Sequence, residues 1–152
     1  MQEVLITIIT GTLGTLGFAL MFKANKNRLF LITLGGFIVS VACVFCSEVF
    51  ESQFYINLFP SLIIALYSEI AARLTKSPAT PFIICGIVPL VPGKGLYYTM
   101  HYFIIGDSLM SSAYLSETLH IAAGIAVGIM VISVVIFELN KKKTYLAFVR
   151  DE

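Results

Sequence analysis

The sequence contains little charge. Only 12% of its 152 residues are Asp, Glu, Lys or Arg, whereas 58% are hydrophobic, and the mean hydropathy is +0.92. Because a soluble domain carries about 25% charged residues, this composition excludes a soluble domain and indicates an integral membrane protein. The formal net charge of +1 and the lack of a separate basic domain give no indication of nucleic-acid binding.

The groups that carry most enzyme chemistry are also missing. There is no catalytic triad, no pair of acid/base carboxylates and no metal-ligand cluster, so we expect neither an enzyme nor a bound cofactor or metal. The three cysteines, Cys43, Cys46 and Cys85, lie in apolar runs and imply no disulfide framework. Cys43 and Cys46 have the spacing C-x-x-C, but the second pair of ligands that a zinc site needs is absent.

What the sequence does contain is long apolar runs. Residues 4–22 hold nineteen residues without a charge, enough at about 1.5 Å per residue to cross a hydrocarbon core of about 30 Å. The first charge is Glu3 rather than a basic residue, and the run exceeds the core of about 7–15 residues in a secretory signal, so we expect this segment to remain as a span. The expected spans are 4–22, 29–47, 54–74, 79–106 and 118–137, followed by a basic tail at 138–152. We therefore predict an all-α polytopic membrane protein, a single transmembrane domain (1–152) with five transmembrane helices of which the fourth is broken.

The positions of the basic residues predict the orientation in the membrane. Nine of the ten lie at alternate ends of the expected spans, namely Lys23, Lys26, Arg28, Arg73, Lys76, Lys141, Lys142, Lys143 and Arg150. The other two connections contain acidic residues and no Lys or Arg. Because cytoplasmic connections carry the excess of Lys and Arg, we expect the N-terminus outside and the C-terminus in the cytoplasm. Only an odd number of crossings agrees with this pattern, so residues 79–106 should cross once; a re-entrant hairpin there would place the tail outside.

The fourth span is interrupted by the stretch CGIVPLVPGKGLYYTM, residues 85–100. Pro89 and Pro92 each remove a backbone donor, and Gly93 and Gly95 add backbone freedom, so we expect the chain to unwind at 89–95. Unpaired backbone groups are tolerated at membrane depth only where they face protein or a wet cavity. Discontinuous helices of this kind build substrate sites in secondary transporters.

The residues around the break suit an anionic ligand. The second half-helix would point its positive end at the break, Lys94 adds a full positive charge, and Tyr97 and Tyr98 offer hydroxyl groups. The candidate substrate site therefore comprises Pro89, Pro92, Gly93, Lys94, Gly95, Tyr97 and Tyr98. The alternative is that the prolines only kink the helix and that Lys94 extends outward to the lipid headgroups.

Three titratable residues are candidates for proton coupling or gating. Glu69 lies four residues before Arg73 on the third span, so the two share a helix face. Glu69 could carry a proton or gate the pathway, or the pair could be a salt bridge that anchors the helix at the interface. Histidine is the residue type whose charge changes near neutral pH, so His101 and His120 could each couple protons or simply pack at the interface.

Small residues recur in two spans. Gly11, Gly14 and Gly17 lie in the first span, and Gly124 and Gly128 lie in the last. Such spacings let membrane helices approach closely. Internal packing accounts for them, and subunit contact is the alternative.

The segment YSEIAARLTKSPATPFIICGIVPLVPGKGLYYTM, residues 67–100, resembles the small-subunit type of the threonine/serine exporter family, which also forms the carboxyl half of the fused members. The shared features are Y-S-E near the end of the third span, a short basic, proline-containing loop, and P-L-V-P-G-x-x-x-Y-Y. The resemblance implies export of threonine and serine, or of dicarboxylates such as succinate, together with a larger partner subunit. The chain departs from the family at Lys94, where a small residue such as glycine is common, and this lysine could favour a more anionic substrate.

These observations predict the membrane subunit of a secondary-active exporter of small carboxylate-bearing metabolites in the cell membrane. We expect it to be coupled to protons and to work with the larger family subunit or as a homo-oligomer. Two other functions remain open on the sequence: a non-transporting scaffold that stabilises a partner, and a homo-oligomeric channel.

Overall fold

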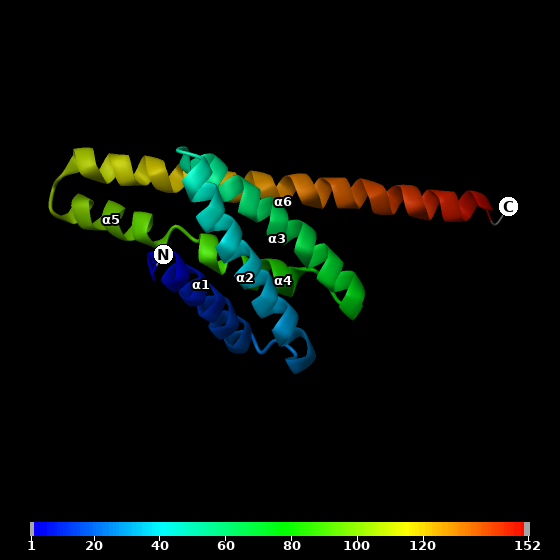
Figure 1. Cartoon of the computed structure of the whole chain (residues 1–152). Coiled ribbons are helices and arrows are strands. Elements are labelled where there is room, and N and C mark those ends of the chain that lie inside the picture. Colours follow the sequence, from blue (N-terminus) through cyan, green and yellow to red (C-terminus); the bar gives the residue numbers. More distant parts are fainter. Residues whose placement is uncertain (1, 151–152) are drawn as a thin grey trace.

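The computed structural model describes the backbone of residues 2–150, and the side chains of all of these except residues 27, 140 and 142–150. In chain order the elements are α1 (Gln2–Met21), α2 (Lys26–Val49), α3 (Gln53–Thr75), α4 (Thr80–Gly86), the short 3₁₀ helix η1 (Val88–Leu90), α5 (Gly93–Ile104) and α6 (Ser108–Arg150). Residues 2–150 contain no strand, which confirms the all-α prediction (Figure 1).

Three helices end in the same way, with a residue in the left-handed conformation that lets the following amide reach back five residues. These residues are Lys23 (φ 51°) after α1, Lys76 (φ 48°) after α3 and Gly106 (φ 81°) after α5. The returning bonds are Ala24 N to Ala19 O (3.0 Å), Ser77 N to Ala72 O (2.9 Å) and Asp107 N to Tyr102 O (2.9 Å). Glycine is the usual residue at this position because it has no Cβ, so the two lysines are unusual.

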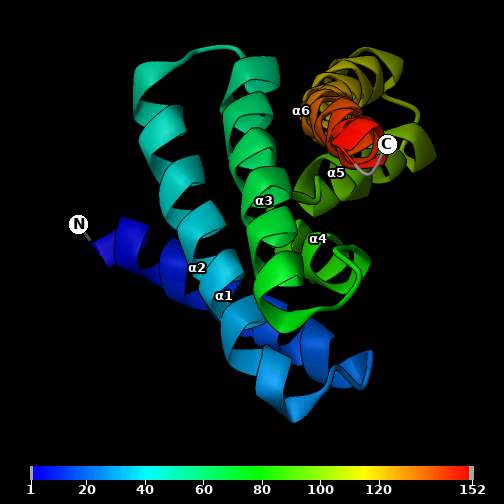
Figure 2. The ribbon, with the colours of Figure 1, turned by 90° about the vertical axis from the view of Figure 1, so that its right-hand side faces the viewer.

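Helix α2 lies between α1 and α3 and approaches both closely (Figure 2). A Cβ on Gly36 would collide with the side chain of Thr15 on α1, and one on Gly35 would lie 2.8 Å from the ring of Tyr67 on α3. The Tyr67 hydroxyl donates a hydrogen bond to the Leu31 carbonyl (2.6 Å), which ties α3 to α2. The first three helices are therefore antiparallel in chain order and tightly packed against one another.

Helix α6 packs along α3 at two glycines. A Cβ on Gly124 would lie 2.5 Å from the carbonyl oxygen of Phe54, and one on Gly128 would lie 2.9 Å from that of Leu58 and would collide with Ser61. The Ser61 hydroxyl also reaches the Gly124 carbonyl (3.3 Å). Internal packing thus occupies these two glycines, as one of the two sequence interpretations expected.

The same contacts give the relative direction of α3 and α6. Phe54 at the start of α3 meets Gly124, and Ser61, two turns later, meets Gly128 further along α6. The two helices therefore run in the same direction, and Figure 1 shows both running from left to right. The chain between them, α4–η1–α5, has consequently returned from the end of α3 to the level of its beginning.

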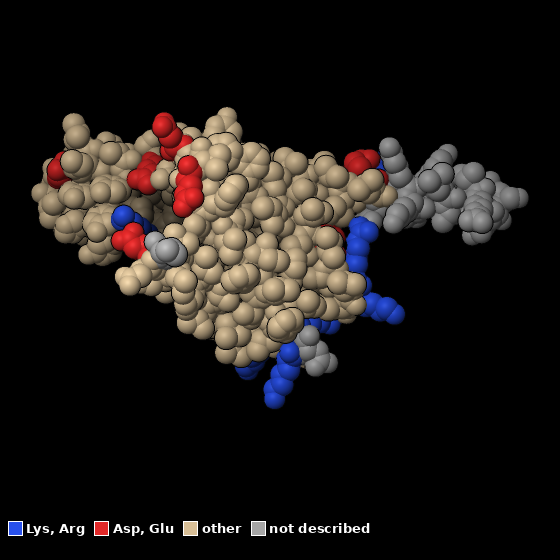
Figure 3. Space-filling view, viewed as in Figure 1, with Lys and Arg blue, Asp and Glu red and all other residues tan. Residues whose placement is uncertain are grey.

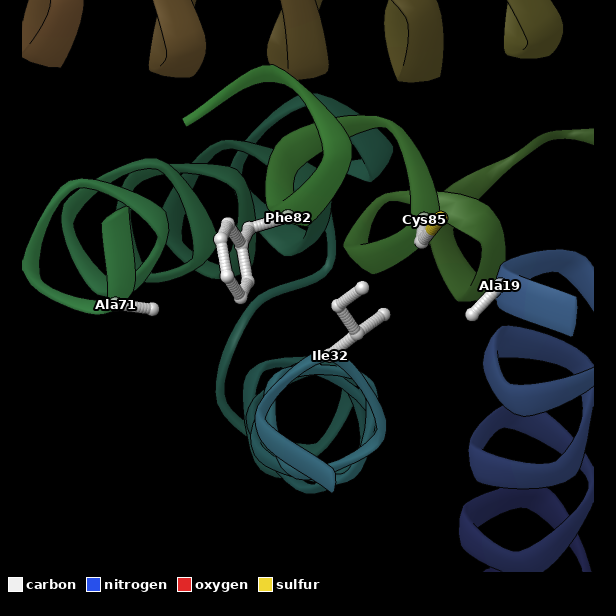
Figure 4. Close-up of a cluster of buried hydrophobic side chains, with 5 residues drawn as sticks. All are labelled: Ala19, Ile32, Ala71, Phe82 and Cys85. Carbon is white, nitrogen blue, oxygen red and sulfur yellow. The ribbon is translucent and has the colours of Figure 1, made fainter. Parts of the chain in front are cut away.

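A small core holds the bundle together where α1, α2, α3 and α4 meet. Its fully buried members are Ala19, Ile32, Ala71, Phe82 and Cys85, which converge from all four helices (Figure 4). Much of the remaining apolar surface is exposed, for example Phe30 on α2 with 75% of its surface accessible. A bundle that buries little and exposes large apolar side chains is stable only in an apolar surrounding, so this surface fits lipid contact.

The last helix begins earlier than the sequence predicted. We expected a connection before a span at 118–137, but α6 already begins at Ser108. Residues 108–117 contain neither Pro nor Gly, and the Asp107 carboxylate accepts a bond from the Met110 amide (3.1 Å), so this residue caps a helix that nothing interrupts. The helical hairpin of α5 and the first turns of α6 forms the arm at the left of Figure 1. The expected tail at 138–152 is helical as far as Arg150, and residues 151–152 lie outside the described part of the chain.

The helices support four or five membrane crossings. Four are long and apolar enough to span: Gln2–Met21, Arg28–Val49, Gln53–Thr75 and Ser108–Leu139. Thr80–Leu90 and Gly93–Ile104 are long and apolar enough to span only when they are taken together, and the chain bends by 54° between them. The fourth expected span is therefore broken, as predicted, and it makes a fifth crossing if the pair is one span.

Candidate functional site

The break lies between α4 and α5 and is packed against three other helices. Gly86 at the end of α4 lies so close to Ile64 of α3 that a Cβ there would collide with it. Pro89 of η1 faces Gly11 of α1, whose Cβ position lies 3.4 Å from the proline Cβ. Leu90 is only 3% exposed and packs with Val39 and Ile64. On this side the irregular backbone therefore faces protein, which is the condition for tolerating it in a membrane.

Hydrogen bonds through the break are short-range and incomplete. The Leu90 amide donates to the Ile87 carbonyl (2.9 Å), and the Gly93 amide to the Val91 carbonyl (2.8 Å). Regular helical bonding resumes with the Leu96 amide, which donates to the Pro92 carbonyl (3.1 Å). Among the described residues, no acceptor receives a bond from the amides of Lys94 and Gly95. These are the free donors of the first turn of α5, where the helix dipole is positive.

The unwound segment is shorter than the sequence predicted. We expected the helix to be unwound from 89 to 95, but α5 begins at Gly93, so Gly93, Lys94 and Gly95 form its first turn. The reason is that Pro92 disturbs the residues before it and not those after it, and a proline fits directly before a helix. The backbone outside the helices is limited to Ile87 before η1 and to Val91 and Pro92 after it.

The first turn of α5 places its residues in different surroundings. Gly93 and Lys94 are exposed, and a Cβ on Gly93 would have no neighbour within 4 Å. Gly95 is buried against Thr118 of α6, so only a residue without a side chain fits between the helices there. The Lys94 side chain is therefore exposed beside the first turn of α5, while Gly95 faces α6.

The two tyrosines of the motif have different environments. Tyr97 is 66% exposed and stacks on His101, with ring centroids 6.1 Å apart and planes at 6°. Tyr98 is half-buried and stacks on Tyr114 of α6 (5.1 Å) and on Tyr102 (6.2 Å). Tyr97 and His101 thus form one exposed pair, while Tyr98 belongs to the contact between α5 and α6.

Sequence reasoning did not identify Tyr102 and Tyr114 as members of this cluster. Their rings stack 5.5 Å apart with planes at 4°, and the Ser111 hydroxyl nearby donates to the Thr99 carbonyl (3.0 Å). The spacing of four between Tyr98 and Tyr102 was visible in the sequence, but Tyr114 becomes a neighbour only because α6 begins at Ser108. These contacts fix α5 against α6 and leave Tyr97 and His101 on the open face.

Glu69 does not lie at the break. It lines an open hollow of about 550 Å³ at the connection between α3 and α4, together with Arg73 and Lys76. His101 lies on α5, beyond the break, so the structure places these two candidates at opposite ends of the α4–α5 segment. A direct proton transfer between them is therefore not supported by their positions.

A second cavity, of about 480 Å³, was not predicted. It lies where the α1–α2 connection meets the start of α4, and its lining includes Lys23, Arg28, Ile32, Ile84 and Cys85. Neither hollow is lined by residues of the break. Within the described side chains there is also no group of three or more His, Cys, Asp or Glu that could hold a metal ion.

Four apolar helices that can span a membrane, with a further pair bent at a Pro/Gly segment, define a polytopic membrane protein. The family model described as Threonine/Serine exporter, ThrE matches residues 7–135. The chain therefore belongs to the threonine/serine exporter family, and the resemblance noted in residues 67–100 is confirmed. No curated protein and no solved structure matches the chain significantly.

Proposed function

We propose that this chain is one half of a secondary-active exporter in the cell membrane, and that its substrates are small metabolites with a carboxylate. The family supports export of threonine and serine, and we extend the proposal to dicarboxylates such as succinate. The observation that carries the proposal is the first turn of α5, where Lys94 and two free amides stand beside an unwound segment. The role is transport rather than catalysis of a reaction.

The geometry suggests how a carboxylate binds. Its oxygens would accept bonds from the amides of Lys94 and Gly95, as anions do at helix N-termini, and the Lys94 ammonium would compensate the charge. Tyr97 stands one turn further along the same open face and offers a hydroxyl to the rest of the substrate. The end of α4 and the start of α5 are both held by packing against neighbouring helices. The backbone therefore has to change little when the substrate binds.

The coupling ion of this proposal is the proton. His101 stacks on Tyr97 beside the proposed site, and imidazole groups are common proton carriers in proteins. Glu69, at the other end of the segment, would act as a gating carboxylate in the hollow that it shares with Arg73 and Lys76. Export would follow from alternate opening at these two ends.

The proposal includes a partner, because many carriers are built from two halves of inverted topology. With five crossings, the N-terminus outside and the C-terminus in the cytoplasm, a partner inserted with the opposite orientation would complete an inverted pair. The larger subunit of the family is the partner we expect, and a second copy of this chain is the alternative. The distribution of charge supports this orientation: Figure 3 shows Asp and Glu gathered mainly near one end of the bundle and Lys and Arg near the other.

The test is export from vesicles that contain both subunits, with threonine and succinate as substrates. Lys94→Gln removes a charged hydrogen-bond donor, a contact worth about 1.5–3 kcal/mol, so succinate export should fall about tenfold or more and threonine export less. A Cβ on Gly93 has no neighbour within 4 Å, so Gly93→Leu should be tolerated by the fold. The added side chain should hinder access to the first turn of α5 and lower export of both substrates. Lys26→Gln, which removes the same charge from the exposed α1–α2 connection, is the control.

The outcome also separates the proposal from its rivals. If Lys94→Gln, Gly93→Leu and Tyr97→Phe all leave every tested amino acid and dicarboxylate exported at the normal rate, the site assignment is wrong. Robust export by the partner alone would identify the chain as a scaffold. Flux that cannot run against a concentration gradient would identify a homo-oligomeric channel.

A further inference from the structure

The cavity at the α1–α2 connection combines two kinds of wall. Lys23 of the α1–α2 connection and Arg28 in the first turn of α2 line it, and the helices that enclose it contribute Ile32, Ile84 and Cys85. Ile32 and Cys85 also belong to the core cluster of Figure 4, so the apolar part of the cavity lies directly on the bundle core. No carboxylate is present among the described residues that line it. The cavity is therefore positively charged at one side and apolar at the other.

The backbone at Lys23 is a second observation that points to the same place. Lys23 is held in the left-handed conformation (φ 51°), which a residue with a Cβ adopts only at a cost and glycine adopts freely. It ends α1 in the same way as Lys76 ends α3, so it is a helix C-cap. The turn that it makes leads the chain along the wall of the cavity, which Lys23, Ala24 and Asn25 all line.

We propose that this cavity binds an anionic phospholipid, with the phosphate between Lys23 and Arg28 and an acyl chain along the exposed side chains of Phe22 and Ile84. The volume of about 480 Å³ lies within the range of about 300–1,000 Å³ that is typical of pockets for small ligands. A lipid fits better than a soluble anion because the wall opposite the cations is apolar, and because the connection lies at a helix end of a membrane-spanning bundle, where headgroups are found. The Thr80 hydroxyl in the lining is a further donor for the headgroup.

Such a lipid would touch the segment that carries the break. Ile84 and Cys85 belong to α4, and α4 leads directly into η1 and the first turn of α5. A lipid between α4 and the α1–α2 connection would hold α4 against α1 and α2. An acidic lipid would bind the two cations more tightly than a neutral one. It would therefore hold the first half of the broken helix more firmly.

The experiment uses the full-length chain in dodecyl maltoside, titrated with phosphatidylglycerol and followed by native mass spectrometry. Phosphatidylcholine, which has no net charge, is the comparison lipid. Lys23→Gln and Arg28→Gln should each weaken phosphatidylglycerol binding about fivefold, the effect of one basic residue near an anionic headgroup. Lys26→Gln is the matched control because it removes the same charge from the same connection but does not line the cavity, and binding should stay within about twofold.

Two further variants separate binding from folding. Ile84→Trp fills the apolar part of the cavity without changing charge and should weaken binding of phosphatidylglycerol. Lys23→Gly removes the cation and relieves the left-handed backbone, so it should lose lipid while its thermal midpoint stays the same or rises. Retention of full lipid affinity by either variant would overturn the proposal.

Three other results would also overturn it. Equal losses in Lys23→Gln, Arg28→Gln and Lys26→Gln would show a diffuse attraction to the basic connection and no defined site. Equal binding of phosphatidylcholine would show that the acidic headgroup is not recognised. Displacement of phosphatidylglycerol by millimolar inorganic phosphate would show that the cavity binds a soluble anion.

Discussion

At the scale of single residues, the glycines of this chain differ in what surrounds them. Gly124 faces backbone atoms of α3, with Phe54 O 2.5 Å and Leu58 N 3.3 Å from the position of a Cβ. Gly17 has no neighbour within 4 Å of that position. Backbone atoms of a packed helix cannot rotate away as a side chain can, so only the first glycine is required by its surroundings.

We therefore expect opposite effects from the same substitution at the two positions. Gly124→Ala should lower the free energy of unfolding by about 1–3 kcal/mol, because α6 must move away from α3. Gly17→Ala should leave it unchanged or raise it by up to about 1 kcal/mol through helix propensity. The measurement is denaturation in mixed micelles followed by circular dichroism, since the chain has no Trp for fluorescence. Equal effects would contradict the proposed α3–α6 contact.

Two serines on α3 form a second matched pair. Ser61 donates to the Leu58 carbonyl (2.7 Å) and reaches the Gly124 carbonyl (3.3 Å), whereas the fully buried Ser68 hydroxyl has no hydrogen-bond partner among the described residues. Ser61→Ala should cost about 0.5–1 kcal/mol of stability. Ser68→Ala should raise stability by up to about 1 kcal/mol, because it removes a buried polar group without a partner. The same denaturation assay measures both, and a loss on Ser68→Ala would mean that this hydroxyl is satisfied by a ligand, water or partner chain.

At the scale of elements, the position of α5 depends on aromatic stacking. Tyr114 of α6 contacts two tyrosines of α5, whereas Tyr97 is exposed and contacts only residues of its own helix. Aromatic pairs contribute about 0.5–1.5 kcal/mol each beyond burial, so Tyr114→Ala should destabilise the α5–α6 contact by about 1–3 kcal/mol. Tyr97→Ala should change stability by less than about 0.5 kcal/mol.

Hydrogen exchange along α5 measures this effect directly. In Tyr114→Ala the amides of α5 should exchange faster, while those of α2 and α3 should keep their protection, because neither packs on Tyr114. In Tyr97→Ala the exchange of α5 should be that of the unmodified chain. Equal acceleration in both variants would show that α5 is not held by the stacked tyrosines.

The elements also show why part of this structure was predictable from the sequence. The broken helix follows from Pro89 and Pro92, whose effect is local and independent of the rest of the fold. The early start of α6 was missed because spans were identified from long apolar runs, and residues 108–117 are too polar to count as one. Tyr114 was therefore not recognised as a neighbour of α5. The cavity beside Lys23 was missed for a different reason: it exists only because the α1–α2 connection meets α4, and residues so far apart in sequence leave no periodic pattern.

At the scale of the whole molecule, the direction of the helices bears on the number of crossings. Helices α3 and α6 run in parallel, so the α4–η1–α5 segment leads from the end of α3 back to the level of its beginning. A re-entrant hairpin would return the chain to the side from which it came, and α6 would then run antiparallel to α3. The helices support four or five crossings, and from this direction we propose one broken crossing and five in total.

The five-crossing topology predicts which connections are exposed on each side of the membrane. In a variant with Cys43, Cys46 and Cys85 replaced by Ala, single cysteines at Glu51 and Asp107 should react with a membrane-impermeant maleimide added to whole cells. Single cysteines at Lys26 and Lys76 should react only after the membrane is permeabilised; all four positions are exposed in the fold.

The deciding position is Asp107, because it alone distinguishes the two topologies. With one broken crossing, Asp107 lies across the membrane from Lys76; with a re-entrant hairpin, the two lie on the same side. Glu51 and Lys26 report orientation and are the same in both cases, so they serve as internal controls for labelling and permeabilisation. Protection of Asp107 in intact cells that label Glu51 would therefore contradict five crossings and would indicate a re-entrant hairpin.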